Sequence, residues 1–151
     1  MDGIFPLTFP PILDTVRAAL PVGLSVYLVG GAVRDALLDR STHDLDFVME
    51  RNAIKFARQV ANTLNADFYP LDSERDTGRV IVTNASGKRW VLDFAAFRGS
   101  NLESDLLGRD FTLNAIAIDL NDNSIHDPLG GAQDLKYRLL RACSPTSFID
   151  D

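Results

Sequence analysis

Hydrophobic and polar residues recur along the chain with two periods, one typical of strands and one typical of helices. Residues 44–49 run Asp-Leu-Asp-Phe-Val-Met, which predicts a strand with Asp44 and Asp46 on one face and apolar side chains on the other. After Asn52, apolar side chains recur at helical spacing as far as Leu64, which predicts a helix with Asn52 as its N-cap. Strand and helix patterns therefore follow each other closely in the chain.

The remaining segments continue this alternation. Strands are expected at residues 25–29, 67–71, 79–83, 89–97 and 115–120, and short helices at residues 11–20, 32–38 and 133–137. Turn residues 84–87 should join two of these strands in a hairpin, and the polar residues 98–108 predict a loop. Because hairpins occur among interleaved helices, we expect an α+β fold with a mixed β-sheet of about five strands and flanking helices.

Length and composition narrow the class of protein. At 151 residues, with 46% hydrophobic and 24% charged residues, the chain has the size and make-up of one globular domain. It contains no run of about eighteen apolar residues, and its first residues lack the basic and apolar regions of a signal peptide. Its single cysteine, Cys143, excludes an internal disulfide. We therefore expect a cytoplasmic protein with no membrane span.

The net charge limits how the chain can bind nucleic acid. Fifteen Lys and Arg residues face 21 Asp and Glu residues, which gives a formal net charge of −6. A protein that holds a nucleic-acid backbone by itself usually presents a basic surface, because phosphate contacts supply much of the affinity. Either the substrate is small, or the grip on nucleic acid lies in sequence outside these residues, and we favour the second alternative.

Three carboxylates form the candidate catalytic centre. Asp44 and Asp46 would repel each other on one strand face unless a cation lay between them, and Mg²⁺ is commonly held by one or two carboxylates together with substrate phosphates. Asp93 is an acid within the otherwise apolar residues 90–97, so it should face a cleft, a metal ion or a cation. The alternative is structural: one Asp caps a turn and the others are solvated.

A double glycine precedes this acidic pair. Gly30 and Gly31 come after a predicted strand and before a predicted helix, where free backbone amides can bind an anion. Arg34 follows within the first turn and can reach either a phosphate or a nearby acid. Taken alone, a glycine pair is also typical of a tight turn, so its weight comes from its position before Asp44 and Asp46.

With these residues the chain resembles the nucleotidyltransferase head domain of bacterial tRNA CCA-adding enzymes and bacterial poly(A) polymerases, the class II members of the DNA polymerase beta-like superfamily. The resemblance extends from about residue 27 to residue 151 and rests on several motifs in order. These are residues 28–35, the acidic pair at 44–46, the strand 91–98, residues 109–115 and the Asp-Pro-Leu-Gly-Gly element at 127–131. It implies the nucleotidyltransferase fold, with Asp44, Asp46 and Asp93 as catalytic metal ligands.

The resemblance also implies a nucleotide site. Gly30, Gly31 and Arg34 would lie near the phosphates, and Arg109, Asp110 and Asn114 near the sugar and phosphates of the nucleotide. Arg suits two-armed phosphate contacts, and Asp or Asn can accept hydrogen bonds from ribose hydroxyls. Asp110 has a structural alternative as the N-cap of a short helix at residue 111. The family usually has two arginines before this Asp, and Gly108 stands in place of the first.

The expected function is the addition of CMP or AMP, from CTP or ATP, to the 3′ end of a tRNA with release of pyrophosphate. Two Mg²⁺ ions would serve as cofactors, and Mn²⁺ could substitute for them. We expect residues 1–140 to be the head domain and residues 141–151 the start of a helical neck. The base-reading arginine and the tRNA-binding body would then lie outside these residues.

Three alternatives remain open at the level of sequence. The chain could be a poly(A) polymerase head, a nucleotidyltransferase with a small-molecule acceptor, or a module that binds a nucleotide without transferring it. The first shares all the motifs with the CCA-adding enzymes, whereas residues 109–114 and the Asp-Pro-Leu-Gly element argue against the second. The third predicts nucleotide binding with no transfer.

Overall fold

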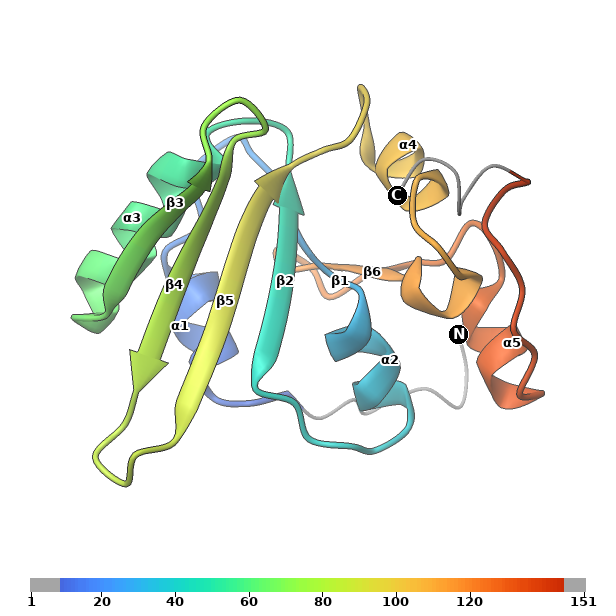
Figure 1. The fold of residues 1–151 in the computed structure, drawn as a ribbon, viewed down its shortest axis with the longest axis horizontal. Coiled ribbons are helices and arrows are strands. Elements are labelled where there is room, and N and C mark those ends of the chain that lie inside the picture. The colour runs from blue at the N-terminus through green and yellow to red at the C-terminus, as the bar shows by residue number, and fades with distance from the viewer. Residues whose placement is uncertain (1–8, 146–151) are drawn as a thin grey trace.

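The computed structural model describes residues 9–145, which form a seven-stranded mixed sheet with helices around it (Figure 1). The strands are β1 (Val26–Val29), β2 (Asp44–Met49), β3 (Asp67–Asp72), β4 (Thr77–Thr83), β5 (Arg89–Ala96), β6 (Ala117–Asp119) and β7 (Ile125–His126). The helices are α1 (Ile12–Ala18), α2 (Gly31–Leu37), α3 (Ala53–Leu64), α4 (Leu102–Leu107), α5 (Gly131–Lys136) and a 3₁₀ turn at Thr112–Asn114. The α+β class expected from the sequence is confirmed.

The strand order places the acidic strands at the centre of the sheet. Strands follow the order β3-β4-β5-β2-β1-β6-β7, and only the central β2–β5 pair is parallel. The predicted hairpin is present as the antiparallel β4–β5 pair. The expectation of about five strands was low by two, because the sheet also takes in β6 with three residues and β7 with two, lengths too short to give a clear alternating pattern.

Alternation along β2 and β5 builds the main core on one face of the sheet. Leu45, Phe47, Leu92 and Phe94 are almost fully buried there, and α1 and α3 cover them from behind in the view of Figure 1. The rings of Phe47 and Phe94 stack with centroids 4.6 Å apart, and Phe56 of α3 meets Phe94 edge-on at 5.3 Å. Such aromatic pairs add about 0.5–1.5 kcal/mol beyond their buried area.

The opposite face of β4, β5 and β2 is here called the open face, because helices cover only part of it. Helix α4 packs over one end through Leu102 and Leu106, which form a second apolar cluster with Val29 and Val48. Asp44 and Asp46 point to the same face as Val48 and remain solvent-exposed. The helices therefore leave the middle of the open face, where the acids lie, accessible to a ligand.

Two local expectations were wrong. The polar residues 98–108 contain helix α4, whose N-cap Asn101 accepts a hydrogen bond from the Ser104 amide. The backbone of Asn52 is in the left-handed region, and its side chain makes no capping hydrogen bond. Instead, the carboxylate of Asp76 accepts hydrogen bonds from the first two amides of α3, each at 2.9 Å. A cap supplied by a residue more than twenty positions away has no local signature in sequence.

Several boundaries moved by a few residues. The expected strand at 115–120 is shortened to β6 by the 3₁₀ turn before it, and the helix expected at 133–137 begins at Gly131. The end of the expected neck segment, residues 146–151, lies outside the described residues. Among residues 9–145, no helix is both long and apolar enough to cross a lipid bilayer.

Candidate active site

Four strands present one row of side chains across the open face. Asp46 of β2 lies directly opposite Asp93 of β5 in the parallel register, and Asp93 lies opposite Arg79 of β4 in the antiparallel register. Val29 is the partner of Asp46 on the other side, immediately before the double glycine. The structure therefore brings the three predicted acids to one face, with Asp44 two residues before Asp46 on the same strand.

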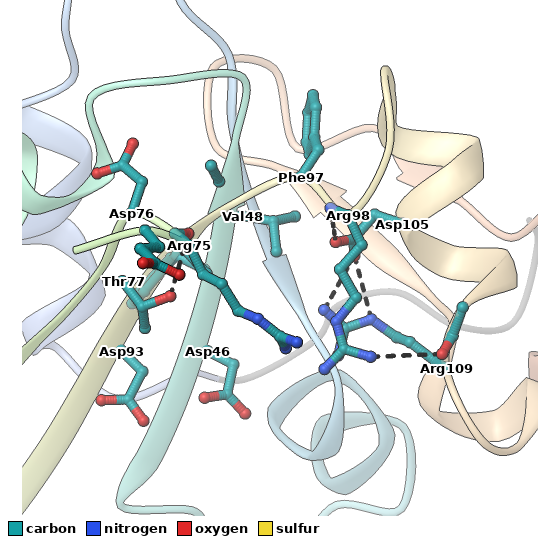
Figure 2. Close-up of a pocket in the computed structure, with 15 residues that line it drawn as sticks. Asp46, Val48, Arg75, Asp76, Thr77, Asp93, Phe97, Arg98, Asp105 and Arg109 are labelled. Atoms are coloured by element: carbon teal, nitrogen blue, oxygen red, sulfur yellow. Dashed lines mark hydrogen bonds and ion pairs between the residues drawn. The ribbon is translucent and has the colours of Figure 1, made fainter. Parts of the chain in front are cut away.

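A cleft of about 760 Å³ opens on one side of this row. Asp46 and Asp93 form part of its floor, and Arg75, Arg98 and Arg109 lie along its walls. Figure 2 shows Arg75 reaching over Asp46 from the β3–β4 turn, while Arg98 and Arg109 project from the opposite wall. Three guanidinium groups facing two carboxylates suit a ligand that combines negative charge with bound cations.

Arg109 is held in place by a buried acid. Its Nη2 and Nε atoms donate to Asp105 Oδ2 at 3.0 and 3.3 Å, and the Asp105 side chain is only 1% exposed. The other Asp105 oxygen accepts the backbone N–H of Arg98 at 2.9 Å. Asp105 thus fixes both the Arg109 side chain and the point at which the Arg98 side chain leaves the backbone.

Gly30 brings the backbone close to the acid pair. Its φ of 72° lies in the left-handed region, and a Cβ built there would lie 3.6 Å from Asp46 Oδ2 and 3.8 Å from an Arg109 guanidinium nitrogen. A side chain at this position would therefore be strained and would also fill the space between Asp46 and Arg109. Gly31 begins α2, and a Cβ built there would lie 3.1 Å from an Arg34 guanidinium nitrogen, so Arg34 lies over this glycine.

The remaining predicted nucleotide residues form one hydrogen-bonded chain. Arg34 donates from Nε to Asp35 at 3.1 Å and from Nη1 to Asn114 Oδ1 at 3.1 Å. Asn114 in turn donates from Nδ2 to Asp110 Oδ1 at 3.2 Å, and this oxygen also accepts the amide of Phe111 at 2.7 Å. Asp110 is not an N-cap, because the 3₁₀ turn begins at Thr112 with Phe111 at its cap position and no side-chain cap. Asp110 instead lies in a network with Asn114 and Arg34.

The negative charge of Asp46 is disfavoured at its place in this row of side chains. Surrounding protein atoms, and secondly the negative charge of Asp93, raise the pKa of the Asp46 carboxyl above its ordinary value, although Arg109 opposes the shift. Asp46 is exposed to solvent at the cleft surface, yet protein walls reduce the water around it. Its charged form is therefore less favourable than in water, which is the condition that a bound cation relieves.

Asp93 already has a cationic partner. Arg79 donates from Nε to Asp93 Oδ1 at 2.8 Å and from Nη2 to Oδ2 at 3.0 Å, and this bonding raises the pKa of Arg79. Within residues 9–145, no group of three or more His, Cys, Asp or Glu side chains is arranged to hold a metal ion. The Asp44–Asp46 pair nevertheless offers two carboxylates on one strand face, the oxygen ligands that hard divalent cations take together with water and substrate phosphates.

A second, smaller hollow of about 350 Å³ lies on the other side of the acids. It is lined by Asp44, Asp46, Arg79, Val91 and Asp93. The two hollows share Asp46 and Asp93, so a ligand in each would meet at these carboxylates. The larger one carries three arginines on its walls, whereas the smaller one has Arg79 as its cation.

Two residues of the site were not identified from the sequence. Arg79 lies at the start of the strand expected at residues 79–83, and alternation along that strand could have placed it on the same sheet face as Asp93. Asp105 lies in the segment expected to be a loop, and only the helical i,i+4 spacing to Arg109 could have indicated their pairing. Both residues orient a predicted site residue.

Known proteins resemble this chain over most of its length. The family model described as the poly A polymerase head domain matches residues 26–101 and 95–141. A CC-adding tRNA nucleotidyltransferase of Geobacter sulfurreducens is 42% identical over 129 residues, which cover 85% of this chain and 29% of that protein. An A-adding tRNA nucleotidyltransferase of Aquifex aeolicus is 35% identical over 139 residues, which cover 85% of this chain and 17% of that protein.

A solved structure agrees with these relatives. A tRNA nucleotidyltransferase complexed with a primer tRNA and an incoming ATP analog matches with a TM-score of 0.77 and 36% identity, over 91% of this chain and 41% of that one. The chain thus spans well under half the length of the proteins it matches. With the family model covering most of its length and relatives above 30% identity on most of its residues, the chain belongs to the poly A polymerase head domain family of nucleotidyltransferases.

Proposed function

We propose that this chain is the catalytic head of a template-independent RNA nucleotidyltransferase that adds CMP or AMP to the 3′ end of a tRNA. The observation that carries the proposal is the Asp44–Asp46 pair on the open face, with the Gly30 backbone and the Arg109 side chain beside Asp46 at the edge of the 760 Å³ cleft. Relatives named CC-adding and A-adding tRNA nucleotidyltransferases supply the substrate class.

The larger cleft is the proposed nucleotide site. Arg109, held by Asp105, would bind phosphate oxygens of CTP or ATP, and Gly30 and Gly31 would let the backbone approach them closely. Arg34, Asn114 and Asp110 are not among the residues that line this cleft, but they form a prearranged polar chain that we propose binds the sugar and its phosphates. Because these side chains already hold each other in position, little conformational entropy would be lost when the nucleotide binds.

Asp44 and Asp46 are the proposed metal ligands, with two Mg²⁺ ions as the physiological choice and Mn²⁺ as a substitute. When bound, the ions would offset the negative charge of the triphosphate and lower the pKa of the attacking hydroxyl. Asp93 is proposed as the third acid, close to that hydroxyl and in place to assist removal of its proton. Its ion pair with Arg79 would hold the carboxylate in a fixed orientation.

The proposed reaction is an in-line displacement at phosphorus. The 3′-hydroxyl oxygen of the RNA forms a bond to the α-phosphorus of the nucleotide and loses its proton, while the bond from that phosphorus to the β-phosphate oxygen breaks. The products are an RNA longer by one nucleotide and pyrophosphate. The protein's contribution is positioning and charge stabilisation, which dominate catalysis of phosphoryl and nucleotidyl transfer.

The proposal includes a division of labour along the parent protein. Residues 1–140 would be the catalytic head and residues 141–151 the start of a helical neck, with base selection and most of the tRNA grip in further sequence. The chain spans 29% and 17% of the two relatives described above, which leaves room for such parts. As tRNA and nucleoside triphosphates are the proposed substrates, we infer that the protein acts in the cytoplasm.

The test is a 3′-end extension assay with the complete protein. The substrates are tRNA lacking its CCA end, Mg²⁺, and CTP, ATP or both, and the products are resolved by length. Wild type should add nucleotides, and Asp46→Asn should reduce the rate at least about 1,000-fold, because a metal ligand is lost. Asp14→Asn, which changes an exposed acid of α1, is the matched control and should keep full activity.

The products also separate the related activities. Two added C residues, a single A, CCA or a long A tract would identify the CC-adding, A-adding, CCA-adding or poly(A) activity respectively. Nucleotide binding by a folded, complete wild-type protein without any extension would reject transfer and support a binding module. Full activity of Asp46→Asn would reject the assignment of the acid pair.

A further inference from the structure

The row of side chains on the open face continues beyond the acids to the edge of the sheet. Tyr69 of β3 is the direct cross-strand partner of Arg79 in β4, just as Arg79 is the partner of Asp93 in β5 and Asp93 the partner of Asp46 in β2. Directly opposed residues point to the same face, so the row runs Tyr69, Arg79, Asp93, Asp46. An aromatic ring thus lies two strands away from the proposed third acid.

Burial shows that Tyr69 faces outward on this row. Its neighbour Phe68 points to the helix side, where its ring lies close to Gly78 and under the guanidinium of Arg58 at 5.0 Å. Successive side chains of a strand point to opposite faces, so Tyr69 projects on the open face, and it is 48% exposed. A large aromatic ring that is half exposed next to an arginine can stack against a planar ligand.

The positions of the two hollows indicate that the RNA acceptor approaches the acids through the smaller one. Attack on the α-phosphorus requires the acceptor hydroxyl and the leaving pyrophosphate on opposite sides of the phosphorus. The larger cleft, with Arg75, Arg98 and Arg109, suits the triphosphate and its leaving group. The acceptor hydroxyl then has to approach through the smaller hollow, whose lining includes the hydrogen-bonded pair of Arg79 and Asp93.

Charge supports the same assignment. An RNA strand that approaches Asp44, Asp46 and Asp93 meets three carboxylates that repel its phosphates. Arg79 is the cation of the smaller hollow and is 39% exposed, and its pair with Asp93 uses two of the five N–H donors of a guanidinium. It can therefore keep Asp93 in place and still attract the backbone of the acceptor.

We propose that Tyr69 and Arg79 form the binding subsite for the 3′-terminal nucleotide of the RNA acceptor. The Tyr69 ring stacks on the terminal base or its neighbour, and Arg79 binds the adjoining phosphate while it positions Asp93. This inference rests on the proposed transfer function and goes further, because it names the residues that present the acceptor hydroxyl to the reacting phosphorus. Stacking on a ring is tolerant of base identity, as expected of a site whose terminal base changes with each addition.

The first test separates acceptor binding from nucleotide binding in the complete protein. Tyr69→Ala should raise the KM for tRNA lacking CCA by about 5- to 100-fold, the usual loss on removing one stacking ring. Its KM for CTP should stay within about twofold. Tyr69→Phe keeps the ring and should match wild type, and Val22→Ala removes a fully exposed side chain between α1 and β1 as a remote control. Arg79→Gln should raise the acceptor KM and also lower kcat, because Asp93 loses its partner.

A second test does not depend on turnover. A tRNA that carries 5-iodocytidine at its 3′ end is bound to the complete protein without nucleotide and irradiated, and the linked peptide is identified by mass spectrometry. A cross-link at Tyr69, lost in Tyr69→Ala, supports the subsite. A cross-link confined to residues of the larger cleft overturns it.

The outcomes distinguish this inference from the function on which it rests. If wild type extends tRNA but Tyr69→Ala has an unchanged acceptor KM, the subsite is wrong and the function stands. If folded wild type neither extends nor cross-links tRNA, the function fails and the subsite fails with it. Circular dichroism of each variant shows whether a change in KM comes from the site or from loss of fold.

Discussion

At the scale of single residues, Asp46 illustrates how a proposed catalytic position works against stability. It lies opposite Asp93, two residues from Asp44 and beside the Gly30 backbone, so its charge is confined near other negative charges. Reduced hydration and the Asp93 charge raise its pKa, which means that the folded protein binds this proton more tightly than the unfolded chain. A cation bound beside Asp46, as proposed, would relieve this cost.

The sign of this pKa shift gives a prediction for the metal-free protein. Because the folded pKa of Asp46 is raised above 3.8, its effect on stability is most favourable below that pH and is lost as the pH rises through the folded pKa. Asp46→Asn removes the charge, so it should raise Tm at pH 7 in EDTA by about 1–3 °C. The gain should vanish below about pH 4, where wild type is also neutral at this position. Thermal unfolding followed by circular dichroism measures both values.

The same variant checks the proposed metal site. Mg²⁺ at millimolar concentration should raise the Tm of wild type, because a ligand that binds only the folded state stabilises it. It should leave the Tm of Asp46→Asn nearly unchanged. The difference in Tm between the two proteins should therefore shrink or change sign. Two results would contradict this account of Asp46. One is an equal rise in Tm with Mg²⁺ in both proteins, and the other is a Tm of Asp46→Asn below that of wild type in EDTA at pH 7.

Single residues also show what a sequence can and cannot predict. Asp44 and Asp46 were predicted to share a face because strand alternation has a strict period of two, and the structure places them so. Asp105 was not predicted, because its role depends on a short helix that brings it to Arg109 and to the Arg98 backbone. A pairing within one strand can be read locally, whereas a pairing through tertiary packing cannot.

At the scale of elements, helix α3 begins with a cap supplied from another part of the chain. Both carboxylate oxygens of Asp76 accept amides at the helix start, those of Ala53 and Ile54. The Asp76 carbonyl also accepts the amide of Ala96 at the end of β5. Asp76 therefore joins α3 to the strand that carries Asp93, and it lines the larger cleft at the same time.

Loss of this cap should be measurable. Asp76→Ala removes both acceptors and places Ala at a φ of 49°, so it should lower the free energy of unfolding by about 2–3 kcal/mol. Asp76→Asn tolerates the same φ and keeps one acceptor oxygen, so it should lose about half as much. Urea unfolding gives the values through the midpoint at constant m. Equal loss in the two variants would argue against capping as the cause.

Element prediction succeeded where the pattern was long and failed where it was short. The hairpin β4–β5 and the helix α3 have six or more residues in phase, and both were predicted with the correct type. Helix α4 has six residues and two acids in its first turn, and the polar residues around it favoured a loop. Its apolar side chains Leu102 and Leu106 become meaningful only once Val29 and Val48 offer them a surface.

At the scale of the whole molecule, charge and shape point to the same division of labour. The sequence has a formal net charge of −6, and the arginines Arg75, Arg98 and Arg109 gather in the cleft beside the acids. At the C-terminal side, Tyr137, Leu139 and Leu140 are 60%, 54% and 68% exposed, an apolar surface that further chain could cover. This concentration of arginines at the proposed nucleotide site supports the proposed division between a catalytic head and a tRNA-binding body.

If the parent protein is divided in this way, the head alone should bind nucleotides well and tRNA poorly. A protein of residues 1–151 should bind CTP or ATP with Mg²⁺, measured by calorimetry, yet its Kd for tRNA in 150 mM salt should be at least about 100-fold weaker than that of the complete protein. The complete protein should lose tRNA affinity steeply between 50 and 200 mM salt, because many phosphate contacts release counterions, and the head should show a shallow slope. Filter binding at several salt concentrations gives both slopes. If the head alone bound tRNA as tightly and with as steep a slope as the complete protein, the grip on RNA would have to lie on the open face itself, and the acidic balance of this chain would no longer be explained by a division between head and body.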